Sequence, residues 1–178
     1  MKRFTKWAEH EFDLGERVIA TLLAGVIFVI LIPFLILKGS TAIDRWLQLM
    51  LFNFGLIYII VGGALALIGC LFAIWSIADQ LTRGRGTPLP MMATQTLLIS
   101  GPFAHCRNPM SFGTIMLYSG LAIWVGSWSA IGLVTTFAVV LIPYLKRIEE
   151  KELEMRFGQS YIEYKRITPF FIPSLLKK

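Results

Sequence analysis

The hydrophobic and polar positions of the chain are arranged in long blocks, and three blocks contain no charged residue. The first covers residues 18–37, close to the ~20 residues that one helix needs to cross a bilayer. The second, residues 46–78, predicts one long helix that protrudes from the hydrocarbon core. The third, residues 112–145, is too long for one crossing, and Gly126-Ser127-Trp128 in its middle predicts a tight turn. We therefore expect four membrane helices, the last two, 110–125 and 129–145, forming a hairpin.

The composition supports this interpretation. Of the 178 residues, 56% are hydrophobic and 16% are charged, whereas a soluble domain has ~25% charged residues. The mean hydropathy is +0.67, and the length suggests a single domain. We expect an all-α integral membrane protein with one domain over residues 1–178. Residues 1–79 would supply an interfacial segment and two helices, and residues 80–178 the functional core.

The basic residues predict the orientation in the membrane. The net charge is +6. The basic residues flank the apolar blocks, and this position favours a bilayer with anionic lipids over nucleic acid as the partner. All lysines and arginines except Lys38 and Arg45 lie before residue 18, within 79–108 or after residue 145. The positive-inside rule then places both termini and the 79–108 loop in the cytoplasm. Aromatic and basic residues within 1–14 predict a short interfacial helix.

Glycines recur every seven residues along the second and third predicted helices. Such spacing keeps them near one helix face, and small residues allow helix backbones to approach closely in lipid. The glycines concerned are Gly55, Gly62 and Gly69 in one helix and Gly113 and Gly120 in the other. They predict packing and say nothing about chemistry.

The ionisable residues avoid the middle of every predicted span, which argues against an ion channel or a proton pump. They gather instead at one level, in the 79–108 loop and after the last apolar block. Cys70 lies in an apolar block and Cys106 lies beside Arg107, so we expect no disulfide framework, and we assign no metal ligands. Any chemistry is expected at the cytoplasmic face of the membrane.

Arg107-Asn108-Pro109 begins the third predicted helix. Proline suits the first helical turn, and Asn108 is then a natural N-cap. The arginine offers a two-pronged guanidinium for a carboxylate or phosphate, beside the free N–H groups of the helix start. The alternative is a plain helix start whose arginine touches lipid phosphates, and this stretch alone favours it.

Glu149 and Glu150 follow the fourth predicted helix. Adjacent carboxylates suit an ammonium group, although on a helix they point ~100° apart and only one can face a site squarely. The alternative is a solvated helix face on which Lys146 pairs with Glu150. Together, an arginine for a carboxylate, an acid for an ammonium and an apolar surface match a zwitterionic amino acid carried on a flat ring, and S-adenosylmethionine is such a molecule.

The C-terminal half resembles the isoprenylcysteine carboxyl methyltransferase and phospholipid methyltransferase superfamily, in a prokaryotic branch. Four motifs carry the resemblance in the family's order and spacing: "GRGTPLP" (84–90), "GPFAHCRNPMSFG" (101–113), "EE" (149–150) and "RFGQSYIEYKRITPFFIP" (156–173). The resemblance covers about residues 80–173, while the first two spans match only in being hydrophobic.

The resemblance implies a cofactor cleft closed by the cytoplasmic helix ends. Arg107 and Glu150 are the implied catalytic residues. Two departures stand out, because the family usually has tyrosine where Phe103 and Ser111 stand, and the loss of a ring at Ser111 affects one contact with cofactor or substrate. The implied cofactor-binding residues are Gly101, Pro102, Arg107, Asn108, Pro109, Ser111, Glu149 and Glu150.

The expected function is S-adenosylmethionine-dependent methyl transfer at the cytoplasmic face of a prokaryotic inner membrane. The acceptor would be lipophilic, an isoprenylcysteine-like carboxylate, a lipidated substrate or a lipid amine that enters from the bilayer. Two alternatives remain: a non-catalytic membrane protein that keeps the fold, for which Ser111 is the best argument, and a membrane reductase with a related C-terminal core. The short N-terminal half argues against the reductase.

Overall fold

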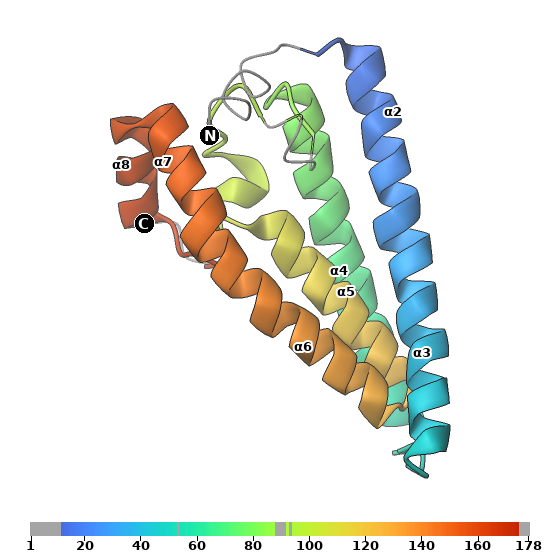
Figure 1. Cartoon of the computed structure of the whole chain (residues 1–178). Helices are drawn as coiled ribbons and strands as arrows, with labels where there is room; N and C mark the ends of the chain where they lie inside the picture. The colour runs from blue at the N-terminus through green and yellow to red at the C-terminus, as the bar shows by residue number, and fades with distance from the viewer. Residues whose placement is uncertain (1–11, 53, 88–91, 93, 175–178) are drawn as a thin grey trace.

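The computed structural model describes residues 12–52, 54–87, 92 and 94–174, and this part of the chain contains helices and no strand. A first continuous helix is followed by α4, by the hairpin of α5 and α6, and by two shorter helices (Figure 1). The helical elements are α2 (Leu14–Gly25), the π-helical turn η1 (Val26–Leu31), α3 (Ile32–Trp46), α4 (Leu56–Thr82), the 3₁₀ turn η3 (Gly101–Ala104), α5 (Pro109–Val125), α6 (Trp128–Tyr144), the π-helical turn η4 (Leu145–Glu149), α7 (Glu150–Phe157) and α8 (Gln159–Ile167).

Within the described residues, three continuous helices are long and apolar enough to cross a membrane, and a shorter apolar helix accompanies them. The three are Leu14–Trp46, Leu56–Thr82 and Trp128–Phe157, and the shorter one is Pro109–Val125. This confirms the all-α integral membrane fold. The hairpin is confirmed as well, since Gly126 adopts a left-handed conformation (φ 72°) between α5 and α6. The predicted interfacial helix lies largely outside the described residues.

The prediction of one helix over residues 46–78 is wrong. Trp46 ends the first helix, and α4 begins only at Leu56. Gln48 has a positive φ of 55° after α3, and Gly55 has a φ of 68° before α4. The segment in which the chain reverses direction between α3 and α4 contains no charged residue. The absence of charge therefore could not distinguish this reversal from a continuous helix.

Asp44 joins the first helix to the turn of the hairpin. Its side chain is 4% exposed, and its carboxylate accepts hydrogen bonds from the Ser127 hydroxyl (2.5 Å) and the Ser129 backbone N–H (3.1 Å). The Ser127 hydroxyl oxygen in turn accepts the Ala130 N–H at 3.0 Å. Asp44 therefore stabilises the start of α6 from another helix.

The glycines of α4 and α5 meet face to face. A Cβ atom built on Gly62 would lie 2.7 Å from the Gly120 carbonyl oxygen, and one built on Gly113 would lie 2.6 Å from the Gly69 carbonyl oxygen. Both distances are too short for a real side chain, so the two backbones are in direct contact. The predicted glycine packing is confirmed for these four residues and wrong for Gly55, which precedes the helix and has no neighbour within 4 Å of a built Cβ atom.

The described helices hold together at one end and spread toward the other. Near the α5–α6 turn, α3 packs on α6, and at the opposite end α2 and α7 diverge (Figure 1). The Tyr118 hydroxyl crosses from α5 to donate to the Phe28 carbonyl in η1 at 2.6 Å. A π-helical turn is a common place for such a carbonyl to be free. The divergent end carries Arg107, Glu149 and Glu150.

Candidate functional site

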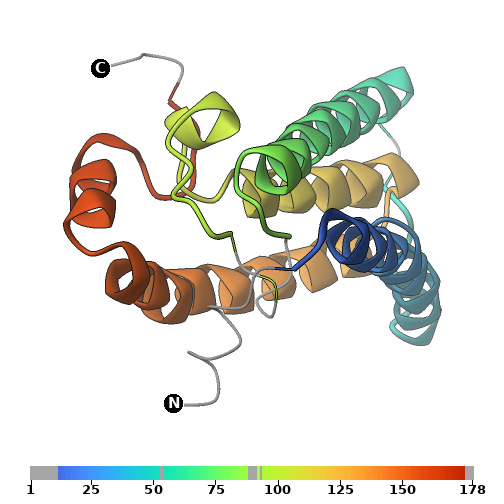
Figure 2. The ribbon, with the colours of Figure 1, turned by 90° about the horizontal axis from the view of Figure 1, so that it is seen from above.

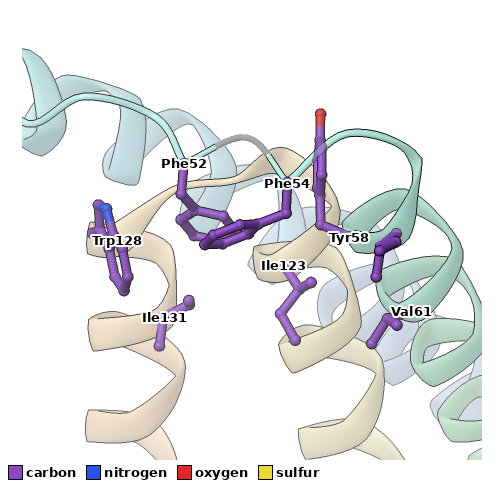
Figure 3. Close-up of a pocket in the computed structure, with 8 residues that line it drawn as sticks. Phe52, Phe54, Tyr58, Val61, Ile123, Trp128 and Ile131 are labelled. Atoms are coloured by element: carbon purple, nitrogen blue, oxygen red, sulfur yellow. The ribbon is translucent and has the colours of Figure 1, made fainter.

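Among the described residues, a cavity lies at each end of the bundle, and the two differ in chemistry. The larger, about 320 Å³, is lined by apolar and aromatic side chains. Figure 3 shows Phe52 and Phe54 lying over it between Trp128 of α6 and Tyr58 of α4, whose hydroxyl points away. The described residues that line it include no charged side chain, although its volume is greater.

The smaller cavity, about 130 Å³, lies where the divergent helix ends and the 83–108 loop meet. Its walls are mixed, with carboxylates, guanidinium groups, amides and hydroxyls beside apolar surface. The lining residues are Gln80, Thr87, Thr94, Phe103, Arg107, Asn108, Pro109, Met110, Ser111, Tyr144, Glu149, Glu152, Leu153 and Arg156. Five of the predicted site residues are therefore brought together here.

Arg107 is held from three sides. Its backbone N–H donates to the Pro169 carbonyl at 2.9 Å, its guanidinium carbon lies 5.5 Å from the ring centre of Phe170, and its Nη1 forms an ion pair with Glu150. Its side chain is 10% exposed, and its buried Nε has no hydrogen-bond partner. The guanidinium is thus fixed in place and retains a donor for a further acceptor.

Glu150 contacts cations of the protein itself. One carboxylate oxygen pairs with Arg107 and the other lies 2.9 Å from Lys165 Nζ, and the side chain is 4% exposed. Lys165 also contacts Glu154 at 2.7 Å, and hydrogen bonds to Glu154 and Glu150 raise the pKa of Lys165. Glu150 does not line the cavity, whereas Glu149 does. The adjacent acids therefore have different surroundings, as the ~100° step between them requires.

Pro109 begins α5 as predicted, and Asn108 occupies the N-cap position. The prediction that the Asn108 side chain caps the helix is wrong, because its amide donates to the Phe170 carbonyl at 3.0 Å instead. The physical reason is the segment after α8, which packs against this loop. Ser174 N–H bonds to the His105 carbonyl, and Figure 2 shows the segment passing beside η3.

Gly101 and Pro102 lie outside the cavity lining. Gly101 has a φ of 61°, and a Cβ atom there would collide with Asp79 of α4, so the turn requires glycine. Pro102 is buried, and the next residue, Phe103, reaches the cavity wall. The Phe103 carbonyl accepts the Tyr164 hydroxyl at 2.6 Å. These contacts place Phe103.

Several residues around the site were missed by the sequence argument. Lys165 pairs with Glu150, and Tyr161 lies beside Glu150 and Arg107, where burial raises its pKa to about 12. Gln80, Thr87, Thr94, Glu152 and Arg156 line the cavity. The two tyrosines of the quoted C-terminal motif, spaced three apart on one helix face, were the available signal.

The fold and the site define a class: a helical membrane protein with a polar cavity at the end of its bundle. Residues 57–160 match the family described as phospholipid methyltransferase, and the chain belongs to this family. The match begins at the start of α4, so this helix is part of the family's domain, which the motifs alone did not indicate.

A curated relative is the cobalt-zinc-cadmium resistance protein CzcN of Cupriavidus metallidurans. It is 25% identical to this chain over 167 residues, which are 93% of this chain and 65% of the relative. The chain therefore spans less than two thirds of that relative's length. No solved structure matches the chain.

Proposed function

We propose that this protein transfers a methyl group from S-adenosylmethionine to a lipophilic acceptor at the membrane surface. The proposal rests on one observation above all: Arg107 and Glu149 line the same cavity, in a domain that belongs to a family of membrane methyltransferases. A guanidinium binds a carboxylate through charge-assisted hydrogen bonds, and a carboxylate binds an ammonium group in the same way. The pair thus fits the amino-acid part of the cofactor.

The surrounding residues fit this assignment. Arg107 uses Nη1 for Glu150 and keeps Nε, which is buried and unpartnered, for the cofactor carboxylate. Glu149 takes the ammonium. Glu150 acts through Arg107, since it orients the guanidinium and does not line the cavity. Asn108, Pro109 and Ser111 form the adjoining wall, and Gly101 and Pro102 contribute indirectly, because they place Phe103.

The cavity accommodates only part of the cofactor in the described state. Pockets that enclose a whole ligand have ~300–1,000 Å³, compared with about 130 Å³ here. Binding of the complete cofactor therefore requires this end of the bundle to widen. The helices α2 and α7 already diverge at this end (Figure 1), whereas α4 and α5 stay joined by their glycine contacts.

The cofactor, when bound, supplies an activated sulfonium methyl group, and the protein's task is to place an acceptor in line with it. A carboxylate acceptor needs no general base. An amine acceptor must lose a proton, and Glu152 in the cavity wall is a carboxylate in a position to take it. The apolar outer surface of the bundle gives a lipophilic acceptor a route from the bilayer.

We propose further that the cavity faces the cytoplasm of a prokaryotic cell, with both termini on the same side. The basic residues that flank the cavity support this orientation. Reporter fusions after residue 178 and within 126–128 should report opposite compartments, and a shared compartment would refute it.

Binding of S-adenosylhomocysteine to the purified protein tests the function. Saturable binding, together with transfer of labelled methyl groups into a lipid extract, is the expected result. Binding without transfer to any fraction would indicate a non-catalytic role, for which Ser111 in the cavity wall is the structural argument. Binding of NADPH in place of S-adenosylhomocysteine would indicate a reductase.

A further inference from the structure

A second group of polar side chains lies where α2 approaches the end of α4, at the contact that Arg17 makes with Leu81. Arg17 and Thr21 are four residues apart and share one face of α2. Gln80 belongs to α4 and lines the cavity. Each has a fully buried polar atom without a hydrogen-bond partner: Arg17 Nε, Thr21 Oγ1 and Gln80 Oε1. Buried polar groups are normally bonded, so three unpartnered atoms in one region require an explanation.

Arg17 points into the protein. Its Nη1 donates to the Leu81 carbonyl of α4 at 3.2 Å, and Figure 2 shows the start of α2 beside the end of α4. An arginine that served bulk lipid headgroups would extend outward to them. Ala24, one turn further along the same face, is also buried. This face of α2 is therefore directed at the bundle.

The charge of Arg17 is not neutralised within the described residues, where no ion pair involves it. The nearest acids in sequence are engaged elsewhere, since Asp13 and Glu16 form a reciprocal capping box at the start of α2. Arg17 stands near the start of α2, yet its guanidinium is turned toward α4. Its natural partner here is an anion supplied from outside the chain.

We infer that Arg17, Thr21 and Gln80 form a headgroup subsite for the methyl acceptor, and that the group bound is an oxyanion, a phosphate or a carboxylate, on a lipophilic molecule. This inference rests on the proposed function. Arg17 binds the oxyanion, the Thr21 hydroxyl donates to it, and Gln80 Oε1 accepts from a neighbouring N–H or O–H of the same molecule. The first helix, which lies outside the matched family domain, thus selects the acceptor.

Ligand-induced stabilisation of the purified full-length chain in a neutral detergent tests this subsite. The probe is dodecyl phosphate, compared with dodecanol and with inorganic phosphate. We expect dodecyl phosphate to raise the unfolding temperature of the wild type. Arg17→Gln should weaken its binding roughly ten- to a hundredfold, which is typical for the loss of a hydrogen bond to a charged group.

Arg45→Gln is the matched control, because Arg45 is an exposed arginine of the same first helix that also donates to a backbone carbonyl, that of Thr41. It should bind dodecyl phosphate like the wild type. Thr21→Val provides a second variant should Arg17→Gln fail to fold, and it should bind more weakly than Thr41→Val.

Four results would overturn the subsite: no stabilisation of the wild type, equal stabilisation of Arg17→Gln (or, if that variant does not fold, of Thr21→Val), equal stabilisation by dodecanol, or equal stabilisation by inorganic phosphate. Equal stabilisation by dodecanol would indicate a site for the apolar tail alone. Equal stabilisation by inorganic phosphate would indicate a site for a free anion. Binding of S-adenosylhomocysteine is measured on the same samples. Its absence would refute the proposed function, whereas its retention in Arg17→Gln, with dodecyl phosphate binding lost, separates the acceptor subsite from the cofactor site.

Discussion

Replacing Asp44 by alanine should destabilise the whole bundle, because it removes the hydrogen bonds between α3 and the start of α6. The carboxylate is buried and accepts two hydrogen bonds, from the Ser127 hydroxyl and the Ser129 N–H. Hydrogen bonds to charged groups contribute about 1.5–3 kcal/mol each. The expected loss of unfolding free energy is therefore about 3–6 kcal/mol.

The structure determines which variants separate the contributions. Asp44→Asn keeps one acceptor oxygen and loses the charge, so it should lose about half as much as alanine. Glu163→Gln is the control for removal of an acid, since Glu163 is exposed on α8. For a chain of this size, 1 kcal/mol shifts the unfolding temperature by roughly 2–4 °C. Alanine at position 44 should therefore lower it by roughly 6–24 °C.

The assay is thermal unfolding of each purified variant in the same detergent, followed by circular dichroism. A decrease for Asp44→Ala no larger than that for Glu163→Gln would refute the reasoning. It would mean that α3 and the hairpin are held by apolar packing alone, and that the two hydrogen bonds contribute no net stability.

Three further predictions concern the site and the packing. Glu149→Gln should weaken S-adenosylhomocysteine binding roughly ten- to a hundredfold, whereas Glu163→Gln should not; equal losses would indicate a general charge effect. Gly113→Ala should lower the free energy of unfolding by about 1–3 kcal/mol, because its Cβ would collide with the α4 backbone. Gly132→Ala should leave the free energy of unfolding unchanged, because open space surrounds Gly132. Equal unfolding temperatures for the two variants would contradict this prediction. Burial raises the pKa of the Cys106 thiol to about 12. In a Cys70→Ala variant, where Cys106 is the remaining cysteine, the thiol should therefore resist maleimide at pH 8 until the protein unfolds. Rapid labelling of the folded variant would contradict this prediction.

The sequence predicted the elements whose signals are local. The hairpin turn follows from Gly126, the start of α5 from Pro109, and the helix contact from the sevenfold glycine spacing, and all three are confirmed. The reversal between α3 and α4 was missed, because the sequence between Trp46 and Leu56 contains no charge and no proline. Helix boundaries built from apolar residues depend on backbone conformation, here at Gln48, which composition does not reveal.

The candidate site was predicted as a set of residues and not as a set of contacts. The sequence placed Arg107 and the acidic pair near one another, yet it could not show that Glu150 contacts Arg107 and Lys165 while Glu149 lines the cavity. Lys165 lies on α8, and its approach depends on how the segment after α6 folds back. The same fold-back supplies the Phe170 carbonyl that draws Asn108 away from the helix start.

The affinity of Arg107→Lys for S-adenosylhomocysteine tests the central claim most directly. Lysine can still pair with Glu150 but lacks the planar fork, so it cannot hold Glu150 and a carboxylate together. We predict a folded protein whose affinity falls roughly ten- to a hundredfold, with Arg85→Lys, an exposed loop arginine, binding like the wild type. Binding by Arg107→Lys as tight as that of the wild type would contradict the account, and Arg107 would then be a structural residue beside the lipid headgroups.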